Sequence, residues 1–451
     1  MGATVEFCRI LASITAESIP PAAVEAARSL LLDGVAVALA GSRERAPAII
    51  AQHIGSLGGA EQATAFNFGF KTSTVGAAYL NGASMHVLDY EPMWNPPTHA
   101  LSTTLPAVLA LGESLGAGGK EMMAALIKGI EAHGRLRVAS RQFEPRGLTF
   151  HPPGVAGPIG SAVAASHLLG LGPDRLRNAV GIAASRAGTL LANIGTMTKC
   201  THCGNAAAAG LDAALLAARG LSANRNIIEA PNGLADGFFD RDWDPGALTM
   251  MDVPLRVVEP GYAIKMFPSQ YATHFVILAA LDARDRIPAS EMISSVEIVG
   301  PVMPYVDRPR PASGLDGKFS FQYAAASALL DGTVGIETFS DERCARPDMS
   351  AMLSKVSFVQ SSDIPATLDH MWVEIKIRLS DGRLVTGKCV RPRGAWGSPI
   401  FEQEHLLKVR DCMRRVLSAN DTENVVAALQ QFDHLNEHEI RALMLTLGGF
   451  Q

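Results

Sequence analysis

Apolar positions recur with helical spacing over the first 260 residues, and glycine or proline separates one run from the next. The first clear run follows Ser18 and two prolines, continues to about Leu39 and is followed by Gly41. A polar cap, an early proline and a glycine after the last turn are typical helix boundaries. The same pattern predicts helices at residues 73–88, 102–115, 120–140, 154–169, 174–187 and 203–219. We therefore expect a helical domain over residues 1–262.

The pattern changes after Lys265. Apolar and polar residues alternate over 371–378 and 384–390, and a Ser-Asp-Gly turn joins these two predicted strands. A further strand is predicted at 294–299, and helices are predicted at 274–286, 319–330, 348–353, 402–417 and 422–432. We expect a smaller α+β domain over 263–394, inserted as a lid, and C-terminal helices over 395–451 that pack back on the helical domain. The predicted fold class is mainly α, a large all-helical domain with an inserted α+β lid domain.

Composition supports packed helices and limits the possible ligands. Hydrophobic residues make up 48% of the 451 residues and aromatic residues only 6%, which favours Ala- and Leu-rich helices over an all-β fold. The formal net charge of -5 provides no general attraction to nucleic acid or anionic lipid. We therefore predict no nucleic-acid or membrane partner, and an anionic ligand must be bound by a local group of cations.

The N-terminal residues lack a basic segment followed by an apolar core, so we expect no export signal. Six cysteines without a disulfide-like pattern are typical of a reducing compartment. The uncharged stretch 147–173 is long enough to suggest a membrane span, but prolines and histidines interrupt it. We predict a cytoplasmic protein in which this stretch forms a buried helix.

Lys199 is the first candidate for chemistry, because it lies between Gly195 and a run of small residues in the segment 193–210, NIGTMTKCTHCGNAAAAG. Glycine permits a tight backbone turn, and four consecutive alanines let helices approach closely. Lys199 is therefore expected to emerge from a crowded interior, where lysine is rarely found without a partner. The alternative is a lysine whose stem covers apolar surface while its ammonium group reaches water.

The adjacent Cys200, His202 and Cys203 could belong to a zinc site or a redox pair. Structural zinc normally needs a second pair of ligands, and the redox motif normally follows a strand in a βαβ unit. The other cysteines occur singly. We expect buried thiols that behave as small hydrophobic residues, and we predict no metal site.

Rigid loops supply the remaining candidates. Asp89 and His99 lie in a loop with three prolines, and His151 directly precedes a glycine-rich helix start. Catalytic groups are common in such loops, although Asp89 could also bond to loop backbone and His99 could be a buried structural histidine. The other candidates are Lys265 and His274 in the segment IKMFPSQYATH, and Tyr305 and Arg308 in the segment PYVDRP.

Four motifs in this order resemble those of the MmgE/PrpD family: HxxDY with a following THA, FHPPxxxG, GTxTKxxHxGNAA and KxFPSQxxTH. Together they span nearly the whole chain. Members of this family include 2-methylcitrate dehydratase, cis-aconitate decarboxylase and iminodisuccinate epimerase. The resemblance implies a homodimer with a polycarboxylate site between its domains and no required metal or organic cofactor. It implies that the catalytic residues are Asp89, His99, His151, Lys199 and Lys265, and that Tyr305 and His274 bind the substrate together with the two lysines.

The chain also departs from the family's pattern. An Asp-Phe-Asp-Asp-Thr run typical of its dehydratases and decarboxylases is here Asp89-Tyr90-Glu91-Pro92-Met93, so the second aspartate and the threonine are absent. The histidine that follows this run is succeeded by Ala-Leu rather than Pro-Ser. These differences leave open which acid is the substrate and whether water, carbon dioxide or nothing is released.

The candidate residues support the same chemistry on physical grounds. Lysines in a partly desolvated cleft can hold carboxylates and stabilise the negative charge that develops when a proton next to a carboxylate is removed. One histidine can act as the base and the other as the acid. We expect a cofactor-independent lyase acting on a small di- or tricarboxylate, with an epimerase as the near alternative. A non-catalytic helical binding module is the remote alternative.

Overall fold

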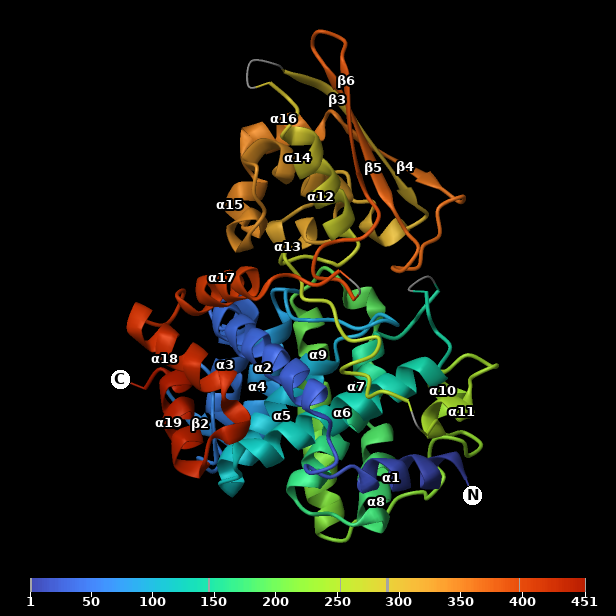
Figure 1. The fold of residues 1–451 in the computed structure, drawn as a ribbon, viewed down its shortest axis with the longest axis vertical. Coiled ribbons are helices and arrows are strands. Elements are labelled where there is room, and N and C mark those ends of the chain that lie inside the picture. The colour runs from blue at the N-terminus through green and yellow to red at the C-terminus, as the bar shows by residue number, and fades with distance from the viewer. Residues whose placement is uncertain (1, 145–146, 252, 289–291, 397, 451) are drawn as a thin grey trace.

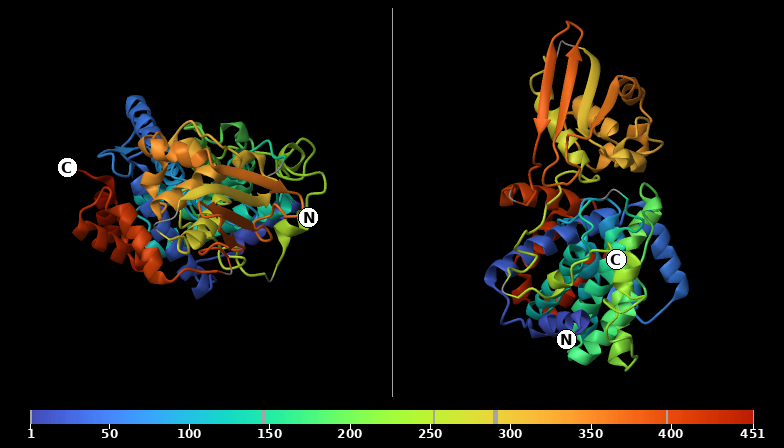
Figure 2. Two further views of the ribbon diagram at one scale, coloured as in Figure 1. Left: turned by 90° about the horizontal axis from the view of Figure 1, so that it is seen from above. Right: turned by 90° about the vertical axis from the view of Figure 1, so that its right-hand side faces the viewer.

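A computed structural model describes residues 2–144, 147–251, 253–288, 292–396 and 398–450. The described chain forms a helical body and a smaller part in which helices cover a sheet (Figures 1 and 2). The predicted mainly α fold class is confirmed. A lid function for the smaller part and the domain boundaries at residues 262 and 394 stay predictions.

Most helices of the helical body come from the N-terminal half of the chain. They are α1 Ala3–Ser13, α2 Pro21–Gly41, α3 Arg45–Leu57, α4 Thr74–His86, α5 Ala100–Leu115, α6 Gly119–Ala139, α7 Pro152–Leu168, α8 Pro173–Ala184, α9 Thr198–Ala218, α10 Leu234–Phe238 and α11 Pro245–Thr249. Two short strands, β1 Ala63–Thr64 and β2 Lys71–Thr72, form an antiparallel pair between α3 and α4. The sequence pattern did not anticipate α1 and α3.

Small residues determine how α9 packs. A Cβ on Gly204 would lie 2.4 Å from the carbonyl oxygen of Tyr79 in α4, and a Cβ on Gly210 would lie 2.2 Å from that of Pro158 in α7. Both positions therefore require glycine, because a side chain would collide with the neighbouring backbone. This close packing places Lys199, in the first turn of α9, beside the loop that follows α4.

The smaller part contains a four-stranded sheet in the order β4-β3-β5-β6. The strands are β3 Ile293–Pro301, β4 Val356–Ser361, β5 Val373–Leu379 and β6 Leu384–Cys389, and the helices of this part are α12 Thr273–Arg284, α13 Gly314–Gly317, α14 Phe321–Asp331, α15 Asp341–Cys344 and α16 Pro347–Leu353. β5 and β6 form the expected hairpin, and β5 also pairs antiparallel with β3. β4 pairs parallel to β3 and was not predicted, because only Val356 of this edge strand is buried.

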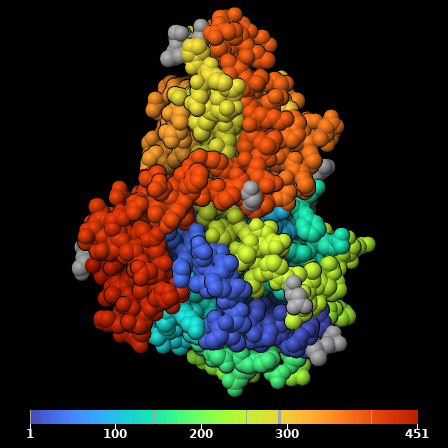
Figure 3. Space-filling model, in the orientation of Figure 1, coloured from blue at the N-terminus to red at the C-terminus, as the bar shows by residue number. Residues whose placement is uncertain are grey.

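The last three helices, α17 Glu402–Met413, α18 Ala419–Gln430 and α19 Glu437–Gly448, lie against the N-terminal helices (Figures 1 and 3). Their apolar side chains share one buried cluster with α2, α5 and α6. The described residues also form four single-turn 3-10 helices, η1 Leu191–Asn193, η2 Pro304–Val306, η3 Ile336–Phe339 and η4 Phe432–His434. Among the described residues, no helix is both long enough and apolar enough to cross a membrane.

Candidate active site

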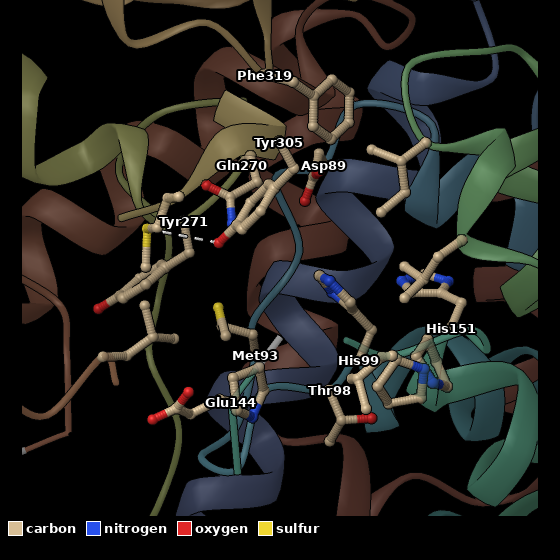
Figure 4. A pocket seen from close by; sticks show the side chains of 18 of the residues that line it. Asp89, Met93, Thr98, His99, Glu144, His151, Gln270, Tyr271, Tyr305 and Phe319 are labelled. Atoms are coloured by element: carbon tan, nitrogen blue, oxygen red, sulfur yellow. Dashed lines mark hydrogen bonds between the residues drawn. The ribbon is translucent and has the colours of Figure 1, made fainter. Parts of the chain in front are cut away.

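A cavity of about 530 Å³ lies between the helical body and the α+β part (Figure 4). Its wall includes Asp89, His99, His151 and Lys199 from the helical body, Lys265 from the connecting segment and Tyr305, Arg308 and Phe319 from the α+β part. Six of the seven predicted site residues therefore line one space, although up to 216 positions separate them in sequence (305 minus 89). His274, which is also described, is not part of this wall.

Asp89 connects both predicted lysines. Lys199 Nζ lies 2.7 Å from Asp89 Oδ2, while Lys265 Nζ pairs with Asp89 Oδ1 and donates to its backbone oxygen at 2.9 Å. Burial raises the pKa of Asp89, but the charges of Lys199 and Lys265 lower it more, so the pKa lies well below its usual range. The two cations thus share one carboxylate and leave about one positive charge in excess.

The loop around Asp89 has an unusual backbone, with a φ of 51° at Asp89 itself. A non-glycine residue adopts this left-handed conformation only when its surroundings stabilise it. Three consecutive carbonyl oxygens each accept a hydrogen bond from a buried lysine: Leu88 from Lys318 at 3.0 Å, Asp89 from Lys265 at 2.9 Å and Tyr90 from Lys408 at 2.9 Å. Lysines from three distant segments therefore fix the position of the Asp89 carboxylate.

Glu91 contacts the predicted site residue His99, and the sequence interpretation did not select it. Its Oε1 accepts a hydrogen bond from Ser102 at 3.1 Å, contacts His86 Nδ1 and lies 3.0 Å from His99 Nδ1. The His99 contact has the distance of an ion pair without hydrogen-bond alignment. A signal was present, since Glu91 occupies the third position of the Asp-Phe-Asp-Asp-Thr run and retains a carboxylate there.

The two predicted histidines occupy the N-terminal ends of helices, His99 before α5 and His151 before α7. Their ring centres are 6.2 Å apart, and His151 Nδ1 lies 3.1 Å from His202 Nδ1. Burial, followed by the charge of Lys199, lowers the pKa of His151 well below its ordinary value. The same two causes lower the pKa of His86 to about 3. Both rings are therefore neutral near neutral pH.

The two residues predicted only as substrate ligands are placed differently. Tyr305 lines the cavity, and its hydroxyl group lies 3.6 Å from Met303 Sδ (Figure 4). His274 is fully buried between Phe267 and Tyr271, and among the described residues neither of its ring nitrogens has a well-aligned hydrogen bond. Burial lowers the pKa of His274 to about 3. The predicted contact of His274 with a substrate does not fit this position, because the motif places the residue on the inner face of α12.

Cys200 and Cys203 are both buried. Burial raises the pKa of Cys200 to about 12 and also raises that of Cys203, as expected for thiols that pack as hydrophobic groups. Among the described residues, three overlapping groups have possible metal-ligand atoms within 4.8 Å of one another: His86, His99 and His151; His86, Glu91 and Cys203; and Asp89, Glu91 and His99. Cys200 belongs to none of these groups.

Two arginines also line the cavity. Arg308 forms an ion pair with Asp316, and its guanidinium group lies 5.3 Å from the centre of the Phe319 ring. Arg137, near the end of α6, donates to Ser140 Oγ and to the carbonyl oxygen of Gln142. The sequence pattern did not identify Arg137, because it lies within an ordinary helical run.

Comparison with known proteins agrees with the four motifs. Residues 5–245 match the model of the MmgE/PrpD N-terminal domain, and residues 267–433 match that of the MmgE/PrpD C-terminal domain. The chain is 32% identical to cis-aconitate decarboxylase of Mus musculus over 83% of this chain and 79% of the mouse protein, and 32% identical to that of Homo sapiens over 82% and 79%. It is 26% identical to cis-aconitate decarboxylase of Aspergillus terreus over 97% of this chain and 94% of the fungal protein.

These relatives are named as decarboxylases, which are lyases, and the match extends over most of both chains. The chain is therefore an enzyme of the lyase type, and this finding excludes the alternative of a non-catalytic binding module. The chain belongs to the MmgE/PrpD family.

Proposed function

We propose that the protein is a cofactor-independent lyase that removes a proton next to a carboxylate of a small di- or tricarboxylate. The main support is the arrangement of the cavity, in which Lys199 and Lys265 share the Asp89 carboxylate beside His99 and His151. The excess positive charge suits a substrate carboxylate, and it also suits the negative charge that develops as the proton leaves. The names of the relatives make cis-aconitate the first substrate to test.

In this proposal His99 is the base. Glu91 lies 3.0 Å from His99 Nδ1, so its carboxylate can orient the ring and stabilise the imidazolium that forms when the other nitrogen takes a proton. His151 lines the same cavity and is kept neutral by burial and by Lys199. As a neutral ring it can accept a hydrogen bond from the substrate, and the proton delivered to the carbon or to the group that leaves is the one that the His99 imidazolium gives back.

An epimerase is the second candidate. Met93 lines the cavity at the position where the family's dehydratases and decarboxylases typically have a threonine. A thioether cannot donate a hydrogen bond to a departing group. Two imidazoles in one cavity could instead remove a proton from one face of a carbon and return one to the other face.

The test is incubation in D2O with a panel of di- and tricarboxylates, followed by proton spectra and mass measurement. The lyase predicts deuterium at a carbon next to a carboxylate together with stoichiometric release of carbon dioxide or water. Deuterium gain with inversion alone would favour the epimerase. Absence of exchange with every polycarboxylate would contradict both proposals.

The proposal includes no metal, no organic cofactor and a homodimer. Exhaustive chelation should leave activity intact, whereas stoichiometric zinc with loss of activity on its removal would contradict the metal-free mechanism. Light scattering on the purified protein measures the oligomeric state, and a monomer would contradict the homodimer.

A further inference from the structure

Arg137 lines the cavity, and among the described residues no acidic side chain forms an ion pair with it. It is 3% exposed, and its hydrogen bonds go to Ser140 Oγ at 3.0 Å, Gln142 O at 2.7 Å and Pro97 O at 3.5 Å. Within the described chain, no carboxylate forms an ion pair with it, and its Nε is buried without an acceptor. A buried guanidinium group normally has a carboxylate partner, because removing its charge from water is costly.

The other cations of the cavity wall already have acidic partners. Lys199 and Lys265 share Asp89, and Arg308 pairs with Asp316. Burial lowers the pKa of Arg137 to about 10, and the charge of Asp240 partly opposes this shift. Arg137 is therefore still positively charged at neutral pH, and among the described residues it is the lining lysine or arginine that forms no ion pair with a protein carboxylate.

The position of Arg137 also relates it to the proposed base. Its bond to Pro97 O reaches the loop two residues before His99, and Pro97, Thr98 and His99 all line the cavity with it. A planar guanidinium group has five N–H donors and binds a carboxylate with two parallel hydrogen bonds. Three hydrogen bonds to the protein, one from Nη1 and two from Nη2, leave one Nη1–H for a ligand, because the remaining donor, Nε, is buried.

We propose that Arg137 binds a second carboxylate of the substrate, while the Lys199–Asp89–Lys265 group binds the first. This inference rests on the proposed function, since it assumes a carboxylate ligand in this cavity. It adds that the enzyme selects compounds with two separated carboxylates over monocarboxylates, and it assigns this selection to a residue of α6.

The test measures binding without turnover. Isothermal titration calorimetry compares a dicarboxylate, glutarate, with the monocarboxylate of equal chain length, pentanoate, for wild type and Arg137→Met. We expect glutarate affinity to fall about 10- to 100-fold in the variant, the effect of losing a charge-assisted contact. Pentanoate affinity should change by less than about threefold, because it has no second carboxylate to lose.

Arg256→Met is the matched control. Arg256 donates to Asn95 O at 2.8 Å and so contacts the same loop as Arg137, but it does not line the cavity. If Arg137→Met acted by distorting the loop, Arg256→Met would reduce glutarate affinity equally, and this would overturn the inference. If Arg137→Met does not fold, Arg137→Lys keeps the charge without the planar fork, and glutarate affinity should fall about 3- to 10-fold.

Two further results separate this inference from the proposed function. Equal glutarate affinity in wild type and Arg137→Met would overturn the role of Arg137 and leave the carboxylate site intact. No binding of any carboxylate to the wild type would overturn both.

Discussion

Two buried aspartates, Asp33 and Asp89, each contact two basic side chains, yet of these two only Asp89 lies at the cavity. Asp33 in α2 accepts from Lys408 Nζ at 3.0 Å and lies 2.9 Å from His405 Nε2. Asp89 is bound by Lys199 and Lys265. In both cases burial raises the carboxyl pKa and the neighbouring cations lower it more, so both carboxylates are ionised.

Asp33 and Asp89 differ in backbone conformation and in whether a ligand can reach them. Asp33 lies in a regular helix and joins α2 to α17 through contacts with His405 and Lys408, which are 372 and 375 positions away in sequence. Asp89 has a left-handed backbone and faces a cavity, where a ligand can compete for its lysines. A buried ion pair therefore does not by itself identify an active site, and access to a ligand distinguishes the two cases.

The largest expected effect distinguishes His99, which lines the cavity, from His405, which contacts Asp33. His99→Asn should lower kcat by about 100- to 10,000-fold, the usual cost of losing a proton-transfer group. His405→Asn should change kcat by less than about threefold, because His405 contacts Asp33 and not the cavity. Steady-state kinetics on both variants, after circular dichroism has verified folding, measures the difference. Equal losses of turnover would remove the distinction between the two groups.

Next in size is the effect of breaking the Asp33 group on stability. Lys408→Met leaves the Asp33 carboxylate buried without this partner, and the free energy of unfolding should fall by about 3–5 kcal/mol. Urea denaturation measures this loss. The double variant Asp33→Leu with Lys408→Met should recover part of it, because no uncompensated charge remains. No recovery would mean that the bond from Lys408 to Tyr90 O, rather than the ion pair, provides the stability.

A somewhat smaller effect is expected at the cavity. Lys199→Met should weaken substrate binding by about 2–4 kcal/mol, which is about a 30- to 1,000-fold rise in the Michaelis constant. The reason is that Lys199 holds a carboxylate in both the ground state and the transition state. Kinetics at saturating and limiting substrate separates binding from turnover. An unchanged Michaelis constant with abolished turnover would instead identify Lys199 as a base.

Local sequence signals predicted most helices, because caps, prolines and glycines act within a few residues. The edge strand β4 escaped prediction since only one of its side chains is buried. At the site, the motifs identified Asp89 and the two lysines but not their pairing, which joins residues 110 and 176 positions apart. Arg137 was missed for a related reason. Its lack of an ion pair among the described residues depends on where side chains from distant parts of the chain lie, which the sequence pattern does not give.

The smallest predicted effect concerns His274. This residue is fully buried, as Asp33 is, but it lies next to Tyr271, which lines the cavity. Burial lowers the pKa of His274 to about 3, whereas the unfolded chain has a histidine pKa of about 6.5. Below pH 6.5 the unfolded state therefore binds a proton that the folded state does not bind. Stability is present above that pH and is lost as the pH falls toward 3, by about 1.4 kcal/mol per pH unit for one histidine.

His274→Phe removes this proton-linked loss. In urea denaturation between pH 6.5 and 5.0, the stability of the variant relative to wild type should rise by about 1 kcal/mol for each unit of acidification. The sign is the decisive result, because a packing defect alone would lower stability by the same amount at every pH. A pH-independent difference would mean that His274 is protonated in the folded state, and a large rise in the Michaelis constant would show that its ring contacts the ligand after all.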